Sequence, residues 1–176
     1  MNAQGRLISR FLEDIPAGKL EWIGLRPARK VAMVSVEKTL AIADRGLQGD
    51  RRLEGSNGSA RQVSIISVEF IRAIADNLGV AHIPADILRR NLLVSGINLN
   101  ALRHQYFQIG SAVFQATAQC HPCSRMETAL GKGGLVAMLG YGGLCAKILE
   151  SGEISCGDEV VYLPPSQYQE RQLSLY

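Results

Sequence analysis

Long apolar runs are missing from this chain of 176 residues. No uninterrupted hydrophobic segment approaches the roughly 20 residues that a membrane-spanning helix needs, so we expect no membrane partner. Aromatic residues are also scarce, at 6% with one tryptophan, but 47% of the residues are hydrophobic, which is too many for a disordered chain. Glycine and proline show no periodic repeat, which excludes collagen-like and low-complexity classes.

A strong excess of either charge is missing as well. The formal net charge is +3 at pH 7, from 19 Lys and Arg against 16 Asp and Glu. This small surplus is compatible with an anionic ligand, but it does not indicate a nucleic-acid surface, and we expect no nucleic-acid partner. A chain of this length can bury roughly two-thirds of its unfolded surface without disulfides or structural metals.

The two ends differ in character from the rest of the chain. Residues 1–16 show no secretory signal, and their apolar side chains, from Leu7 to Ile15, recur at helical spacing. They predict an amphipathic extension that packs on the body or on a partner. Residues 165–176 are polar and are expected to form a mobile or partner-bound tail. Without a secretory signal, we expect a cytoplasmic protein with reduced thiols.

Between these ends, many short segments of β-branched residues alternate with glycine turns. Strands are expected near residues 19–25, 31–42, 62–66, 91–95, 144–149 and 159–163, and a hairpin or a bulged strand around Gly110 is expected at residues 107–116. The clearest helix begins after Ser67, whose hydroxyl can cap the first turn, and ends at Gly79. Shorter helical turns are expected at residues 84–90 and within 120–130. The pattern predicts an α+β domain, mainly β and barrel-like, over residues 17–164.

Glycine turns also punctuate the polar segments. Two such turns, at Gly152 and Gly157, separate the last two expected strands. The Gly-Asp pairs at residues 49–50 and 157–158 are each expected to form a turn in which the aspartate binds its own backbone.

The four cysteines include a C-x-x-C motif at residues 120–123. A thioredoxin-type redox pair would need a βαβ context, and a zinc site would need a second close pair, which the spacing of Cys145 and Cys156 does not provide. The motif also suits a reactive thiolate, since Arg125 and a following helix start would lower the thiol pKa. Such a thiolate can bind a soft metal or carry a persulfide. Burial of both cysteines as small apolar residues is the remaining alternative. Cys145 and Cys156 are expected to be structural.

Two basic clusters precede expected strands. One is Arg61 with Gln62, and the other is Arg89 and Arg90 with Asn91. Arginine offers paired donors to phosphate, and the neighbouring amides suit the edge of a heterocycle. If both clusters meet at one end of a barrel, they form an anion pocket; otherwise they are solvated surface arginines.

In order along the chain, these segments resemble the MOSC domain, the module named for the C-terminal part of molybdenum cofactor sulfurases. The order and spacing of the motifs carry the resemblance, which extends over about residues 17–164. The matching segments are residues 18–27, 46–51, 61–66 with Glu69, 90–96, 107–110, 120–123, 143–154 and 157–158.

The resemblance implies a β-barrel-like fold with a pocket for the molybdenum cofactor, a pterin with a phosphate and a dithiolene-bound metal. It also implies that one cysteine binds molybdenum or carries sulfur as a persulfide, and Cys123 is the better match to that residue. The residues expected to contact the cofactor are Arg61, Gln62, Arg89, Arg90, Asn91 and Arg125.

We therefore expect a stand-alone MOSC protein, without the additional domain of the amidoxime reductases or of the sulfurases. Its expected function is to bind molybdenum cofactor or to carry sulfur for it, with Cys123 as metal ligand or persulfide carrier. The expected partner is a pyridoxal-phosphate cysteine desulfurase. One alternative is a molybdenum-dependent reductase of N-hydroxylated compounds, fed by an electron-donor protein. Another is a non-enzymatic module that binds a small molecule or a partner.

Overall fold

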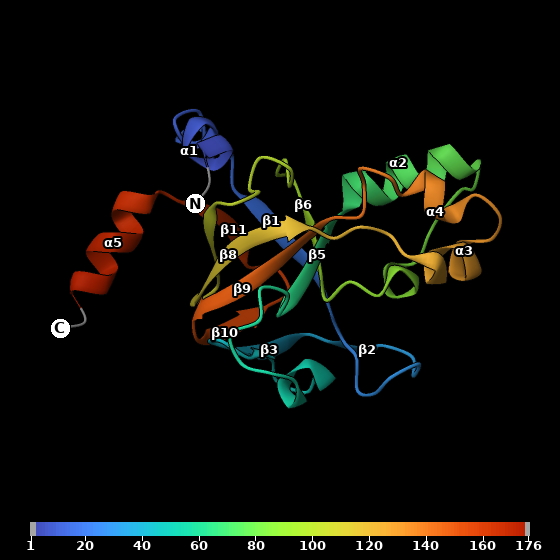
Figure 1. Ribbon diagram of the computed structural model, residues 1–176, viewed down its shortest axis with the longest axis horizontal. Coiled ribbons are helices and arrows are strands. Elements are labelled where there is room, and N and C mark those ends of the chain that lie inside the picture. The colour runs from blue at the N-terminus through green and yellow to red at the C-terminus, as the bar shows by residue number, and fades with distance from the viewer. Residues whose placement is uncertain (1–2, 175–176) are drawn as a thin grey trace.

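The computed structural model describes residues 3–174 and is built around a closed ring of strands (Figure 1). All neighbouring pairs in the ring are antiparallel except β5 and β6, which are parallel. In spatial order the ring comprises β11 (Glu159–Leu163), β7 (Tyr106–Ile109), β8 (Ala112–Gln119), β9 (Leu144–Glu150), β5 (Val63–Ser67), β6 (Leu92–Ser95) and β1 (Gly18–Leu25). The predicted barrel-like α+β class, mainly β, is confirmed.

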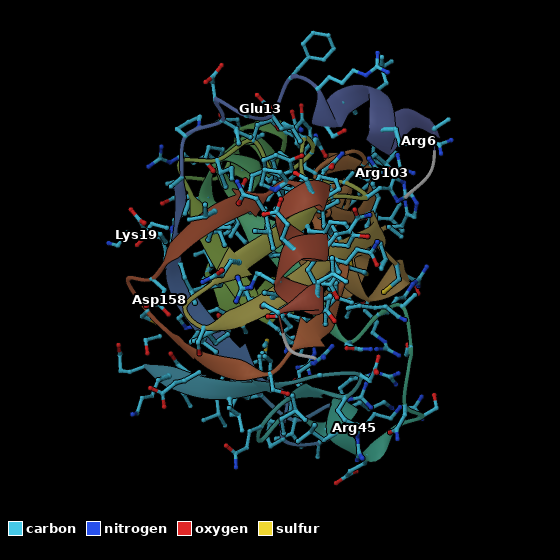
Figure 2. The ribbon with its side chains drawn as sticks, turned by 90° about the vertical axis from the view of Figure 1, so that its left-hand side faces the viewer. Arg6, Glu13, Lys19, Arg45, Arg103 and Asp158 are labelled. Atoms are coloured by element: carbon cyan, nitrogen blue, oxygen red, sulfur yellow. The ribbon has the colours of Figure 1, made fainter. Side chains whose placement is uncertain are left out.

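The ring closes where its first and last strands meet. β1 pairs with β11 through Gly18 opposite Val160 and Lys19 opposite Glu159. Figure 2 shows Lys19 and Asp158 on this side of the barrel. The backbone N–H of Leu20 donates to the Asp158 carbonyl at 2.8 Å, which ties the turn before β11 to β1. Closure leaves these strands without a free pairing edge.

Four further strands lie outside the ring. β2 (Val34–Val36) extends the large sheet beside β1, and a separate sheet has the order β10-β3-β4. Its strands are β3 (Lys38–Ile42), β4 (Gly46–Leu47) and β10 (Gly152–Ser155).

The apolar core fills the ring. Phe107 and Phe114 are fully buried and stack with their ring centroids 5.3 Å apart, across the β7–β8 pair. A second buried cluster, which includes Ile74, Leu88 and Met138, lies between the helices and the sheet. Each fully buried aliphatic side chain contributes roughly 1.5–3 kcal/mol, so these two clusters hold the strands together.

Short helices flank the barrel on two sides. Figure 1 shows α2, α3 and α4 grouped at one end, with α1 and α5 on the opposite side. None of the helices in residues 3–174 is long and apolar enough to cross a membrane. The helices are α1 (Ala3–Ser9), α2 (Val68–Leu78), α3 (Ser124–Leu130), α4 (Gly134–Ala137) and α5 (Pro165–Leu173), with 3-10 turns η1 (Arg51–Glu54) and η2 (Ala85–Leu88).

The caps predicted for the longest helix are confirmed. The Ser67 hydroxyl accepts a hydrogen bond from the Phe70 backbone N–H at 3.1 Å. Gly79 ends α2 in the left-handed conformation, at φ 67°. Ser67 is also the last residue of β5, so one side chain sets the point where the strand becomes a helix.

The N-terminal extension contains the short helix α1, in keeping with its helical spacing, whereas the C-terminal tail is more ordered than the sequence suggested. α1 ends at Ser9, after which Leu12 is buried in the core while Phe11 stays exposed. The expected polar tail forms α5, and Tyr168 stacks on Tyr106 with ring centroids 4.7 Å apart. Residues 1–2 of the predicted extension and 175–176 of the predicted tail lie outside the described residues.

Two strand boundaries differ from prediction. The single strand expected at residues 31–42 is divided into β2 and β3, which belong to different sheets. Gly152 begins strand β10 instead of forming a turn, and a side chain there would collide with the backbone of Ser111. The other turn is confirmed, because Gly157 has φ 98° and the Asp158 carboxylate accepts from the Ser155 N–H at 2.8 Å.

Candidate functional site

A hollow of about 340 Å³ brings together residues from the segment after β1, from η1, from the segment before β6 and from the start of α3. Seven of its lining side chains are basic and none is acidic. We call it the first hollow. It is lined by Arg26, Arg29, Lys30, Arg51, Arg89, Arg90, Cys123, Arg125 and Met126.

Arg90 is the most firmly held of these arginines. It is buried, its Nε donates to the Gly142 carbonyl at 2.8 Å, and its Nη1 donates to the Leu88 carbonyl at 2.9 Å. Its Nη2 lies 3.4 Å from the Cys120 carbonyl. These bonds fix the guanidinium before any ligand arrives, which lowers the entropy lost on binding.

Arg89 reaches the same hollow because of an unusual backbone conformation. It ends η2 in the left-handed region, at φ 55°, where non-glycine residues are uncommon. Its Nη1 donates to the Val31 carbonyl at 2.8 Å. Both arginines of the predicted pair therefore line one hollow, although neighbouring residues of a strand would point in opposite directions.

Arg26 is held by a buried carboxylate. Its Nε and Nη2 donate to the two Asp50 oxygens at 2.9 and 3.1 Å, and Asn91 Nδ2 donates to the same carboxylate at 2.8 Å. Burial raises the pKa of Asp50, but the hydrogen bonds and charge of Arg26, with the N–H groups of Arg26 and Arg52, lower it on balance. Asp50 is therefore a carboxylate at neutral pH and orients Arg26.

A second hollow of about 300 Å³ adjoins the first. Arg26 and Arg51 line both, so the two share a wall. The second hollow is lined by Arg26, Arg51, Arg52, Glu54, Gly55 and Arg61.

The cysteines of the C-x-x-C motif differ in exposure. All four cysteines are free thiols. Cys123 is exposed, lines the first hollow and occupies the cap position before α3, whereas Cys120 is half-buried. The alternative in which both cysteines are buried as small apolar residues does not describe Cys123.

Cys120 forms a thiol pair with Cys145. A hydrogen bond from the Cys145 thiol lowers the pKa of Cys120 to about 6, against the effect of burial, with help from the charges of Arg90, Arg61 and Arg26. The same hydrogen bond and burial raise the pKa of Cys145. Cys120 is thus the thiolate of the pair near neutral pH. Cys145 was expected to be structural, and the structure places it beside this thiolate.

The structure brings together most of the predicted site residues. Arg89, Arg90, Cys123 and Arg125 line the first hollow, and Arg61 lines the second. Both basic clusters therefore lie at one end of the barrel, which is the arrangement that an anion pocket requires.

Gln62 and Asn91 line neither hollow. Both side chains are 1% exposed. Gln62 Oε1 accepts from the Ile148 N–H at 2.8 Å, and its Nε2 has no hydrogen-bond partner among residues 3–174. Asn91 Oδ1 accepts from the Ser64 hydroxyl at 3.0 Å. Both amides thus link neighbouring strands of the barrel through buried hydrogen bonds. Direct contact of either amide with the cofactor stays a prediction.

Several site residues were missed from the sequence. Arg26, Arg29 and Lys30 directly follow the first strand, and this run of basic residues was the available signal. The prediction that Asp50 binds its own backbone is confirmed, because its Oδ1 accepts from the Arg52 N–H at 2.8 Å. Its bond to Arg26 joins segments 24 residues apart and has no local signature.

The protein residues alone do not form a metal centre here. Within the described part of the chain, no group of three or more His, Cys, Asp and Glu side chains is placed to hold a metal ion. A metal at this site would have to bring most of its own ligands. One exposed thiol beside a group of guanidinium donors fits a pterin cofactor with a phosphate and a dithiolene-bound metal.

Comparison with known families agrees with this chemistry. The MOSC domain family profile matches residues 50–161. The chain belongs to the MOSC domain family. This range includes Asp50, Arg61, Arg90 and Cys123, while Arg26 lies before it. Among functionally curated proteins, none matches the sequence.

Solved structures share the fold of this MOSC chain at low sequence identity. The YUAD protein from Bacillus subtilis is 22% identical, with a TM-score of 0.70 over 82% of this chain and 94% of that one. YiiM from Geobacillus stearothermophilus is 14% identical, with a TM-score of 0.66 over 83% and 75%. YiiM from Escherichia coli is 18% identical, with a TM-score of 0.60 over 82% and 69%.

Proposed function

We propose that this MOSC protein binds a molybdenum cofactor, with Cys123 as the only protein ligand to the metal. The observation that carries the proposal is the exposed Cys123 thiol on the rim of a hollow lined by seven basic side chains. A thiolate suits a soft metal, and guanidinium groups suit the phosphate of the pterin. Family membership supports a molybdenum cofactor as the class of ligand. The side chains that line the first hollow are the reason for assigning the cofactor to it.

The arginines bind and orient the anionic end of the cofactor. Arg90 and Arg26 are already held by buried hydrogen bonds, so they present fixed donors. Arg125 lies two residues beyond Cys123 and lines the same hollow, so it adds a further cationic donor beside the thiol. When bound, the cofactor supplies a redox-active metal held by two dithiolene sulfurs.

A persulfide on Cys123 is the second form of this proposal. The exposed Cys123 thiolate would attack the terminal sulfur of a persulfide on a pyridoxal-phosphate cysteine desulfurase. The S–S bond of the donor breaks, the donor leaves as a thiolate, and the sulfur stays on Cys123. The exposure of the thiol favours this form, because the donor is another protein and must reach it.

Elemental analysis together with intact mass tests both forms. Protein purified from a cofactor-competent host should contain about one molybdenum per chain, or gain one sulfur atom after incubation with a desulfurase and cysteine. Cys123→Ser should remove either signal, whereas Cys156→Ser, which changes a half-buried thiol outside both hollows, should retain it. Protein with neither molybdenum nor persulfide would refute the proposal.

The same preparations separate a carrier from a reductase. A molybdenum-loaded protein that reduces an amidoxime with an artificial electron donor is a reductase of N-hydroxylated compounds. A loaded protein that is inactive in this assay but passes its cofactor or sulfur to an acceptor enzyme is a carrier.

A further inference from the structure

The basic residues of the site are more numerous than one phosphate requires. The two hollows together hold nine different basic side chains and one acidic side chain, Glu54. Since the whole chain has a net charge of only +3, its positive charge is concentrated at this place. Asp50 neutralises Arg26, but a phosphate monoester brings a charge of only about −2. The surplus indicates a second anionic group.

The surplus donors lie in and beside the second hollow. Within the described residues, the side chains of Arg51 and Arg61 have no hydrogen-bond or ion-pair partner. Arg52 Nε is buried and also unpartnered there, while its Nη2 donates weakly to the Ser56 carbonyl at 3.3 Å. A buried guanidinium N–H without a partner is costly, and an anionic ligand would satisfy it.

Continuity between the hollows allows one ligand to occupy both. Arg26 and Arg51 form the shared wall, which is where a bridging anionic group would receive donors from two sides. The pKa of Cys120 responds to Arg90 of the first hollow, to Arg61 of the second and to Arg26 between them. The three guanidinium groups therefore all lie close enough to Cys120 for their charges to affect its thiol.

Glu54 gives the second hollow a different character from the first. Its carboxylate is exposed and has no ion pair among residues 3–174. A carboxylate in an otherwise cationic hollow repels a bare anion but accepts hydrogen bonds from sugar hydroxyls. Arginine N–H groups that donate to a phosphate, next to a carboxylate that accepts from sugar hydroxyls, suit a nucleotide.

We propose that the second hollow binds a nucleotide joined by a pyrophosphate to the pterin held in the first hollow. The ligand of this protein is then a dinucleotide form of the cofactor, with the pyrophosphate at Arg26 and Arg51 and the ribose at Glu54. This inference rests on the proposed function, because it needs the pterin in the first hollow.

The nucleotide content of the loaded protein tests the inference. Protein from a host that makes the dinucleotide form should release about one nucleoside monophosphate per molybdenum when mild acid cleaves the pyrophosphate. Arg61→Ala and Glu54→Ala should each lower the nucleotide retained after dialysis by about tenfold, the effect of one lost charge-assisted hydrogen bond. Arg72→Ala removes one positive charge, as Arg61→Ala does, at an exposed position on α2, and should retain the wild-type ratio.

The outcomes separate this inference from the proposed function. Molybdenum and pterin phosphate at one per chain without nucleotide would overturn the inference and leave the proposed function standing. A persulfide on Cys123 with no pterin would also overturn it, while the sulfur-carrier form stands. Protein without molybdenum, pterin or persulfide would overturn both. Arg61 and Glu54 are exposed, and their side chains form no hydrogen bond or ion pair with any of residues 3–174, so these variants should fold normally.

Discussion

Asp50 is a single residue on which several parts of the site depend. Its carboxylate binds Arg26 just after β1, the Asn91 amide before β6 and the Arg52 N–H of η1. It is 3% exposed, so a lost contact is not replaced readily by water. One buried anion therefore positions donors from three segments that are distant in sequence.

Replacing this carboxylate should destabilise the fold. Asp50→Asn removes the charge that compensates Arg26, and we expect a loss of about 3 kcal/mol in the free energy of unfolding, measured by urea denaturation. Because folding lowers the pKa of Asp50 below 3.8, the carboxylate stabilises the protein above about pH 4. The difference between wild type and variant should shrink as pH falls below that value. Asp76→Asn, on an exposed face of α2, should change stability little.

Cys120 should behave as an acidic thiol. Because its thiolate accepts a hydrogen bond from Cys145, its alkylation by iodoacetamide should follow a titration centred near pH 6. The rate should be nearly constant above pH 7 and fall below pH 6. Peptide mapping in a Cys123→Ser background isolates this signal. Cys145→Ala removes the donor and should move the midpoint towards the ordinary thiol value near ~8.5. A wild-type midpoint already at that value would contradict the proposed thiol pair.

At the scale of single elements, the junction of β5 and α2 depends on a cap. Ser67→Ala should lower the free energy of unfolding by about 1 kcal/mol, because the Phe70 N–H loses its acceptor at a buried helix start. Ser166→Ala is the matched control, since this exposed serine near the start of α5 makes no cap hydrogen bond. Chemical denaturation of both variants gives the comparison, and equal effects would show that the cap contributes nothing.

Gly143 controls how closely β9 approaches β5. It has φ 86°, and a Cβ there would collide with the Ile65 carbonyl. Gly143→Ala should therefore cost several kcal/mol and reduce the yield of folded protein, seen in thermal denaturation. Gly140→Ala measures the cost of the left-handed backbone conformation without a steric clash, because Gly140 has φ 83° and a Cβ added there would meet open space. That control should cost only about 1–2 kcal/mol.

At the scale of the whole molecule, charge is distributed unevenly. Nine basic side chains meet around the two hollows in a chain whose net charge is +3. Pyrophosphate should therefore bind the apoprotein, and calorimetry should show about a tenfold loss of affinity as ionic strength rises from ~0.01 M to ~0.15 M, where screening shortens from ~30 Å to ~8 Å. Affinity that is independent of salt would argue against an electrostatic site.

Local signals account for the elements that the sequence predicted well. α2 carries its own start at Ser67 and its own stop at Gly79, and the hairpin of β7 and β8 turns at Gly110 with φ 53°. The strand β10 was missed because it is short and pairs with β3, which precedes it by more than 100 residues. α5 was missed because its order comes from packing, such as Tyr168 on Tyr106.

The site likewise combines features that the sequence predicts with features that depend on the fold. The sequence by itself determined the mainly β class, the caps of α2, the C-x-x-C motif and the arginine clusters, since each is encoded by residues close together in the chain. Only the tertiary structure decided which arginines share a hollow, that Asp50 holds Arg26, and that Cys120 pairs with Cys145 while Cys123 faces solvent. These relations depend on closure of the strand ring, which brings together segments that no local pattern connects.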